Sequence, residues 1–108
     1  MILSKHLIRL AAATLALVSA VPALAAPHVV TMANMSFGKI PADLKVGDTI
    51  TWVNRDTVPH TATARDHSFD VRTAPGQSVT MTLSKAGTFA FSCIYHSMMR
   101  GTMKVTAK

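Results

Sequence analysis

Beyond residue 26, apolar and polar residues alternate in several short runs with the two-residue period of a β-strand. The longest run, residues 78–84, has the sequence Ser-Val-Thr-Met-Thr-Leu-Ser, which is typical of a strand that buries one face. Residues 48–53 place Ile50 and Trp52 on a common face. No run in this region has the 3.6-residue period of an amphipathic helix, so the pattern predicts a chain built of strands.

The C-terminal third contains two more predicted strands. Residues 88–93 place Phe89, Phe91 and Cys93 on one face, and Met103 shares a face with Val105 in the last run. Turn signals separate the predicted strands: Val46-Gly47-Asp48, Pro75-Gly76, Lys85-Ala86-Gly87 and Arg100-Gly101. Short strands at this spacing predict an all-β sandwich or a small barrel.

The first 25 residues have the pattern of a secretory signal. A positively charged start precedes an uncharged apolar stretch at residues 10–21, and Ala23-Leu24-Ala25 matches a signal-peptidase site. We therefore expect residues 1–25 to be a cleaved signal peptide and residues 26–108 to be the mature domain, exported to the periplasm. The apolar stretch is shorter than the ~20 residues that cross a bilayer, so we expect no membrane insertion after cleavage. An uncleaved membrane anchor is the alternative that the sequence leaves open.

The composition narrows the classes of function. The 108 residues suffice for one small domain, with 11 Lys and Arg against 5 Asp and no Glu. Because the basic residues are scattered and lack interleaved aromatic residues, we expect no nucleic-acid partner. Cys93 is the only cysteine, which excludes an internal disulfide and any multi-cysteine metal site within the chain.

The candidate chemistry lies around Cys93. Cys93, His96 and Met99 form a C-x-x-H-x-x-M motif, and His60 stands upstream after a proline. Two imidazoles, a thiolate and a thioether are the ligands of a blue-copper electron-transfer site, with the methionine as a weak axial ligand. The thiolate stabilises Cu(I) and the imidazoles suit both oxidation states, so little geometry has to change when an electron moves. We therefore predict one type 1 copper per chain, bound by His60, Cys93, His96 and Met99.

The spacing also predicts how the site is placed. Because Cys93 shares the face of two phenylalanines, its sulfur should point into the apolar end of the sandwich, where burial alone would raise the pKa of the thiol. The following loop should return His96 and Met99 to the same point. We expect His60 to come from the opposite sheet. Met98 is the alternative axial ligand, but a single residue would then separate it from His96, so Met99 is preferred.

Other potential metal ligands have simpler explanations. Met32 and Met35 have the M-x-x-M spacing of Cu(I) carriers, but strand geometry would put them on opposite faces, which favours a core or a surface position. Pro27 lacks the amide that an N-terminal Cu(II) chelate at His28 requires. His67 lies in a polar run and is expected to be solvated. Asp66 and Asp70 do not form a credible acid–base pair, and no carboxylate adjoins the candidate ligands in the sequence. We therefore expect no enzyme activity.

A series of residues along the chain matches the pattern of a known family: Gly47-Asp48-Thr49, Trp52, Asn54, Pro59-His60, Ser68-Phe69-Asp70, the run from Gly87 to Cys93, His96, Met99 and Gly101. Through these residues the chain resembles the cupredoxins, and among them most closely the amicyanin group. It implies a Greek-key β-sandwich and one-electron transfer, with His96 near the surface as the electron port. The chain departs from the pattern at Thr61, where many cupredoxins have asparagine, and at Tyr95 and Ser97, where amicyanin loops carry prolines around the second histidine.

These observations favour a soluble, monomeric periplasmic carrier of single electrons between redox proteins, such as a periplasmic dehydrogenase or a c-type cytochrome. The alternative is a periplasmic copper chaperone or storage protein that holds Cu(I) through the same residues. A preorganised four-ligand site favours the electron carrier, because rapid exchange of metal with a partner prefers a more open site. A structural β-sandwich that binds no metal is a third possibility.

Overall fold

The computed structural model describes residues 24–108, so the predicted signal segment lies outside the described residues except for its last two. In the described range the regular elements are all strands. They are β1 (Pro27–Ala33), β2 (Ser36–Phe37), β3 (Leu44–Lys45), β4 (Thr49–Asn54), β5 (His60–Ala64), β6 (Asp70–Thr73), β7 (Ser78–Thr82), β8 (Gly87–Ser92) and β9 (Arg100–Thr106). None of these residues forms a helix that is long and apolar enough to cross a membrane.

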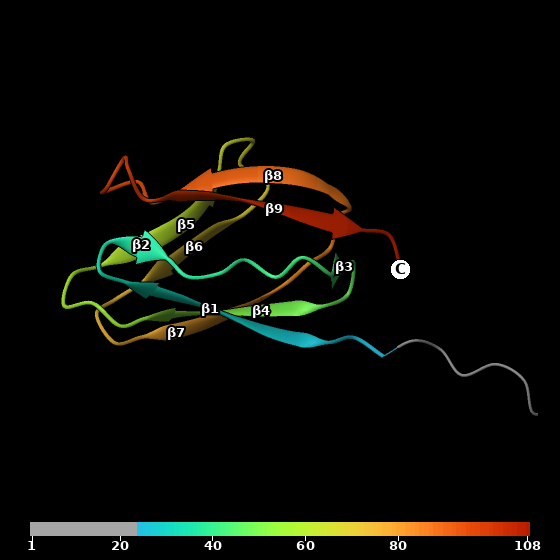
Figure 1. Ribbon diagram of the computed structural model, residues 1–108, viewed down its shortest axis with the longest axis horizontal. Coiled ribbons are helices and arrows are strands. Elements are labelled where there is room, and N and C mark those ends of the chain that lie inside the picture. Colours follow the sequence, from blue (N-terminus) through green and yellow to red (C-terminus); the bar gives the residue numbers. More distant parts are fainter. Residues whose placement is uncertain (1–23) are drawn as a thin grey trace, which may run out of the picture.

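The strands form two layers (Figure 1). One sheet has the order β2-β1-β4-β7, and the other has the order β3-β9-β8-β5-β6. β1 runs parallel to β4 and β3 parallel to β9, whereas the other pairs are antiparallel. Two separate packed sheets confirm the predicted all-β sandwich and not the small barrel.

The alternation of apolar residues predicted the buried faces of the strands. Ile50 and Trp52 of β4 are buried, and the predicted inward-facing residues of β8 and β9 are buried as well: Phe89, Phe91, Met103 and Val105. β7 is only half-buried on its apolar face, because it lies at the edge of its sheet. The two-residue period therefore decides which side chains form the core.

Aromatic rings fill the centre of the core. The ring of Trp52 lies edge-on to Phe91, with centroids 5.4 Å apart, and edge-on to Phe37 at 5.8 Å. Phe91 faces Gly101 of the neighbouring strand. A Cβ atom on Gly101 would lie 2.7 Å from the Cζ atom of Phe91, so this position has no room for a side chain. The glycine thus leaves room for the ring of Phe91, which stands two residues before Cys93.

The expectation that His60 belongs to the opposite sheet was wrong. β5 lies beside β8 in the five-stranded sheet, with Thr63 opposite Ser92 and Ala64 opposite Phe91. The chain crosses between the sheets earlier, in residues 55–59 between β4 and β5. Sequence separation alone does not tell at which connection a chain changes sheets. His60 and Cys93 are therefore brought together by neighbouring strands of one sheet.

Candidate metal centre

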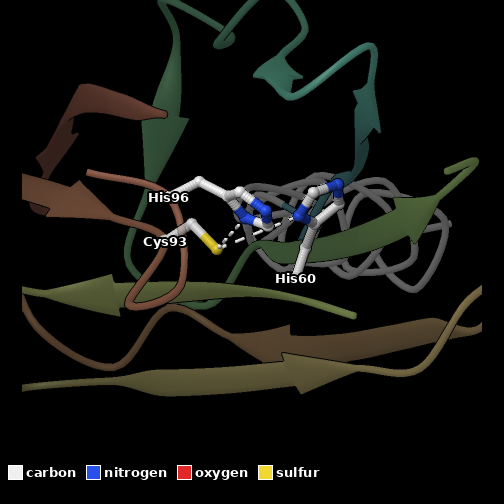
Figure 2. Close-up of side chains that lie close together, drawn as sticks. All are labelled: His60, Cys93 and His96. Carbon is white, nitrogen blue, oxygen red and sulfur yellow. Dashed lines mark hydrogen bonds between the residues drawn. The ribbon is translucent and has the colours of Figure 1, made fainter. Parts of the chain in front are cut away.

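Three of the predicted ligands lie together at one end of the five-stranded sheet (Figure 2). His60 is the first residue of β5, Cys93 follows β8, and His96 lies in the loop that leads to β9. Their potential ligand atoms all lie within 4.8 Å of one another. The Sγ atom of Cys93 is 3.9 Å from Nδ1 of His60 and 3.5 Å from Nδ1 of His96. Both imidazoles thus turn the same nitrogen toward the sulfur.

The two candidate methionines are in different surroundings. Met99 is buried at 1% exposure, and Met98 is 88% exposed. His60 and Cys93 are buried too, whereas His96 is half-buried. Burial therefore favours Met99 over Met98 as the fourth ligand, and this assignment remains a prediction.

The three-residue spacing of the motif matches the hydrogen bonding of its loop. The amide of His96 donates to the carbonyl of Cys93 at 3.4 Å, and the amide of Met99 donates to the carbonyl of His96 at 2.9 Å. These are successive bonds of the kind that closes β-turns. The amide of Cys93 donates in turn to the carbonyl of Met99 at 2.9 Å and closes the loop on itself. Backbone bonds therefore shape this loop without the prolines found in amicyanin loops.

Thr61 connects the two segments that supply the histidines. Its amide N–H donates to the sulfur of Cys93 at 3.4 Å. Its Oγ1 atom accepts a hydrogen bond from the amide of Ile94 at 3.0 Å and another from the hydroxyl of Thr63 at 3.0 Å. Thr61 therefore ties β5 to the ligand loop, even though its side chain is shorter than the asparagine found at this position in many cupredoxins.

Sequence reasoning missed Asp56, which contacts the far side of His60. The Nε2–H group of His60 donates to Oδ2 of Asp56 at 2.7 Å. The carboxylate also accepts the backbone N–H groups of Asn34 at 2.8 Å and Met35 at 3.0 Å. A proton held on Nε2 leaves the lone pair of Nδ1 directed at the sulfur, and carboxylates commonly orient metal-binding histidines in this way. The sequence offered one signal for this contact, because Asp56 stands four residues before the candidate ligand His60.

The hydrogen bonds shift the pKa values of the site. The pKa of Asp56 falls to about 2, because its carboxylate accepts the amide of Met35 and the proton of His60. Burial lowers the pKa of His60, but the hydrogen bonds to Asp56 and Cys93 outweigh it and the net shift is upward.

The pKa of Cys93 is lowered, to about 6, which contradicts the expectation from burial alone. Burial does act to raise it, but the hydrogen bonds from His96 and from the amide of Thr61 favour the thiolate more strongly. The thiolate is the form of cysteine that binds metals. The protein therefore stabilises the ligand form of the sulfur with its own groups.

Comparison with known proteins places this geometry in a family. The family model for the Cupredoxin-like domain matches residues 7–105. The chain belongs to the cupredoxin-like family. It is 32% identical over 83 residues to amicyanin from Paracoccus denitrificans, an alignment that covers 71% of this chain and 63% of that protein. The chain thus spans less than two thirds of the length of this curated relative.

Solved structures of amicyanin agree with the family. The Cu(I) form of a methionine-to-glutamine variant has a TM-score of 0.65 and 29% identity, covering 73% of this cupredoxin and 81% of that chain. The Cu(I) form of a methionine-to-alanine variant has a TM-score of 0.64 and 32% identity, covering 79% of this chain and 85% of that one. The predicted resemblance to cupredoxins of the amicyanin group is confirmed.

The residues of this cupredoxin fit copper, the metal that its amicyanin-like relatives bind. Two imidazole nitrogens and a thiolate with a lowered pKa are donors that suit copper rather than the hard cations Mg²⁺ or Ca²⁺. The remaining candidates have other surroundings. His28 pairs with Asp48, His67 is exposed in a turn, and Met32 is buried in the core.

We predict that Asp56→Asn weakens copper binding by roughly 10- to 100-fold, the usual cost of removing a group that orients a metal-binding histidine. The side-chain amide of the asparagine can still contact Nε2 of His60, but it no longer requires that the proton of the ring be on Nε2. Competition with a coloured Cu(I) chelator measures the affinity. Asp66→Asn removes an exposed carboxylate that accepts hydrogen bonds from Ser68 in a turn, and it serves as the control. An affinity of Asp56→Asn equal to that of Asp66→Asn would contradict the role of Asp56.

We also predict that the metal-free protein deprotonates Cys93 with an apparent pKa of about 6. The ultraviolet absorbance of the thiolate, followed against pH, measures this value. His96→Ala removes the hydrogen bond that favours the thiolate most and should move the midpoint to higher pH. A midpoint near the ordinary thiol value of about 8.5 in the unmodified protein would show that burial dominates instead.

Proposed function

We propose that this protein carries single electrons between redox partners through one type 1 copper held by His60, Cys93, His96 and Met99. The observation that carries the proposal is the buried sulfur of Cys93, which faces the Nδ1 atoms of two imidazoles within an amicyanin-like fold. Copper bound there would supply a one-electron couple between Cu(I) and Cu(II). We propose on the same grounds that the protein is a carrier and not an enzyme.

The surrounding residues hold the donors in one arrangement. Thr61 donates its amide to the sulfur of Cys93, Asp56 fixes the proton of His60 on Nε2, and turn bonds fix the loop. A site fixed in this way changes little between oxidation states, which lowers the structural cost of gaining or losing an electron. The chain's own hydrogen bonds therefore hold the ligand side chains in place.

His96 is the ligand through which an electron would enter or leave. It is half-buried, whereas His60 is completely buried. Apart from the buried Met99, the large apolar residues of its loop are exposed at the same end of the molecule: Ile94, Tyr95 and Met98. An apolar surface around the outermost ligand suits a short-lived complex with another redox protein. We propose a periplasmic dehydrogenase or a c-type cytochrome as partner, and a monomer as the working form.

The first residues of the chain support a proposal for its location. We propose that residues 1–25 are a signal peptide, that residues 26–108 form the copper-binding domain, and that the protein works in the periplasm. An oxidising compartment is compatible with the single Cys93 only if its thiol is protected. Cys93 is 2% exposed, and its sulfur would be shielded further by the bound metal.

A Cu(I) chaperone or storage protein is the alternative. The exposed Met98 could offer a first contact for Cu(I) at the surface. Against this role, His60, Cys93 and Met99 are all buried, so transfer of the metal to a partner would require the loop to open. Burial of the donors therefore favours electron transfer over metal transfer.

The first experiment is to load the protein with one equivalent of Cu(II) and record its visible absorption and electron paramagnetic resonance spectra. We expect an intense thiolate-to-copper charge-transfer band and a narrow copper hyperfine splitting, followed by rapid electron exchange with a c-type cytochrome. Cys93→Ser should remove the band and preserve the far-ultraviolet circular dichroism of the β-fold. Tight binding of Cu(I) without a stable Cu(II) form would favour the chaperone.

The two adjacent methionines provide a matched test of the axial ligand. We predict that Met99→Leu raises the reduction potential and alters the visible spectrum, because the axial ligand tunes the potential of blue-copper sites. Met98→Leu makes the same chemical change at an exposed position and should leave both properties unchanged. Protein-film voltammetry measures the potentials. A shift in Met98→Leu and none in Met99→Leu would assign the axial position to Met98.

A further inference from the structure

Asp48 is a buried carboxylate at the end of the sandwich opposite the metal centre. It is 4% exposed and lies in the turn before β4. Its Oδ1 atom accepts a hydrogen bond from the backbone nitrogen of Ala26 at 2.9 Å. Its Oδ2 atom accepts the amide of Lys45 at 3.1 Å and lies 3.0 Å from Nε2 of His28. These contacts, with that of Ala26 the strongest, keep the pKa of Asp48 below its usual value.

Ala26 is exposed, but its backbone is hydrogen-bonded to the fold. Its nitrogen binds Asp48, and its carbonyl accepts the amide of Thr49 at 3.1 Å. β1 starts at the next residue, with Pro27 opposite Thr49. Immediately upstream, Ala25 is exposed and Leu24 is 89% exposed. The bond between Ala25 and Ala26 is therefore accessible, and it is the bond at which the sequence predicts cleavage.

We propose that Asp48 is the binding site for the α-ammonium group that Ala26 gains when a signal peptidase cuts the chain after Ala25. Hydrolysis adds water across the peptide bond, so Ala25 leaves as a carboxylate and the nitrogen of Ala26 becomes an amine that takes up a proton. Before cleavage this nitrogen offers one neutral N–H to Asp48. After cleavage it offers a positive charge, so the Coulomb attraction between two opposite charges is added to the hydrogen bond that Asp48 already accepts.

The surroundings of Asp48 can accommodate this charge. A hollow of about 580 Å³ lies beside the carboxylate and is lined in part by Leu24, Ala25 and Lys108. Cleavage removes Leu24 and Ala25 and so opens the hollow to water. Water can then hydrate the N–H groups of the ammonium that do not bind Asp48. The other charged or titratable groups that contact Asp48 or line the hollow are His28 of β1, Lys45 of β3 and Lys108 after β9. All three are present before and after cleavage.

The ion pair would connect processing to stability. It anchors Ala26, the residue immediately before β1, and β1 lies between β2 and β4 in its sheet. A precursor that still carries its leader lacks the charge and has the weaker contact. The mature fold would therefore be more stable than the same fold within the uncut chain.

The first test is the intact mass of the exported protein. The full chain is expressed with its own leader in a bacterial host, and the copper-loaded product is recovered from the periplasm. We expect a mass that begins at Ala26. A product that begins at any other residue would overturn the proposal, because its α-ammonium could not occupy the position of the Ala26 nitrogen.

The second test compares a chain that begins at Ala26 with one that begins at Ala25, each with and without Asp48→Asn. All nine strands lie within residues 27–106, so both chains contain the described fold. We expect the Ala26 chain to have an unfolding constant roughly five- to tenfold smaller in urea titrations. The difference should disappear in Asp48→Asn and persist in Asp43→Asn, which changes an exposed carboxylate. The proposal would be overturned if the Ala26 and Ala25 chains with Asp48 intact were equally stable, or if their difference in stability survived Asp48→Asn.

The pH dependence gives an independent readout that needs no substitution of Asp48. Pairing with a carboxylate raises the pKa of an α-ammonium above its ordinary value of about 8. Its contribution to stability is therefore complete below about pH 8 and is lost as the pH rises through the folded-state pKa. The excess stability of the Ala26 chain over the Ala25 chain should therefore decrease as the pH rises above about 8. An excess that stays constant across this range would show that the charge is not its origin.

Discussion

The metal centre depends on the two-residue period of β8, which directs the side chain of Cys93 into the interior. Phe89 and Phe91 share the inner face of this strand, and Cys93, the residue directly after it, continues the alternation. The packing of two aromatic rings therefore also fixes where the sulfur lies. The other groups of the site reach the sulfur from elsewhere: the amide of Thr61 from β5, His60 from the start of the same strand, and His96 from the loop. A shift of β8 by one residue would turn the sulfur to the outer face and dismantle the whole arrangement.

The two sheets are coupled at the metal centre by Asp56 rather than by a ligand. His60 belongs to the same sheet as the strand that precedes Cys93. Its Nε2–H, however, is held by Asp56, which also binds the backbone of Asn34 and Met35 in the turn between β1 and β2. Asn34 and Met35 both have positive φ angles, of 54° and 59°, and such a turn presents consecutive N–H groups to one carboxylate. The orientation of a ligand on one sheet thus depends on a turn of the other.

The parts of this structure that the sequence predicts are those set by local periods. Alternation identified the buried faces of β4, β8 and β9, and the three-residue spacing of Cys93, His96 and Met99 corresponds to successive turn bonds. The sheet to which His60 belongs could not be predicted, because it depends on which connection crosses the sandwich. The direction of the pKa shift of Cys93 was missed for a related reason. It depends on hydrogen bonds from Thr61 and His96, whose directions are set only in the folded chain.

Two buried or nearly buried carboxylates mark the opposite ends of the sandwich, and they share a pattern. Asp56 and Asp48 each accept backbone N–H groups and each contact the Nε2 atom of one histidine, His60 and His28 respectively. The same local chemistry therefore occurs twice in one small domain. The two histidines differ in what faces their second ring nitrogen, Nδ1.

His60 turns its Nδ1 atom toward the sulfur of Cys93, the only cysteine in the sequence. No second thiolate exists that could complete such a site at His28. A carboxylate–histidine pair fixes the orientation of an imidazole, and the group that faces the free nitrogen decides whether that imidazole serves a metal centre or the stability of a strand.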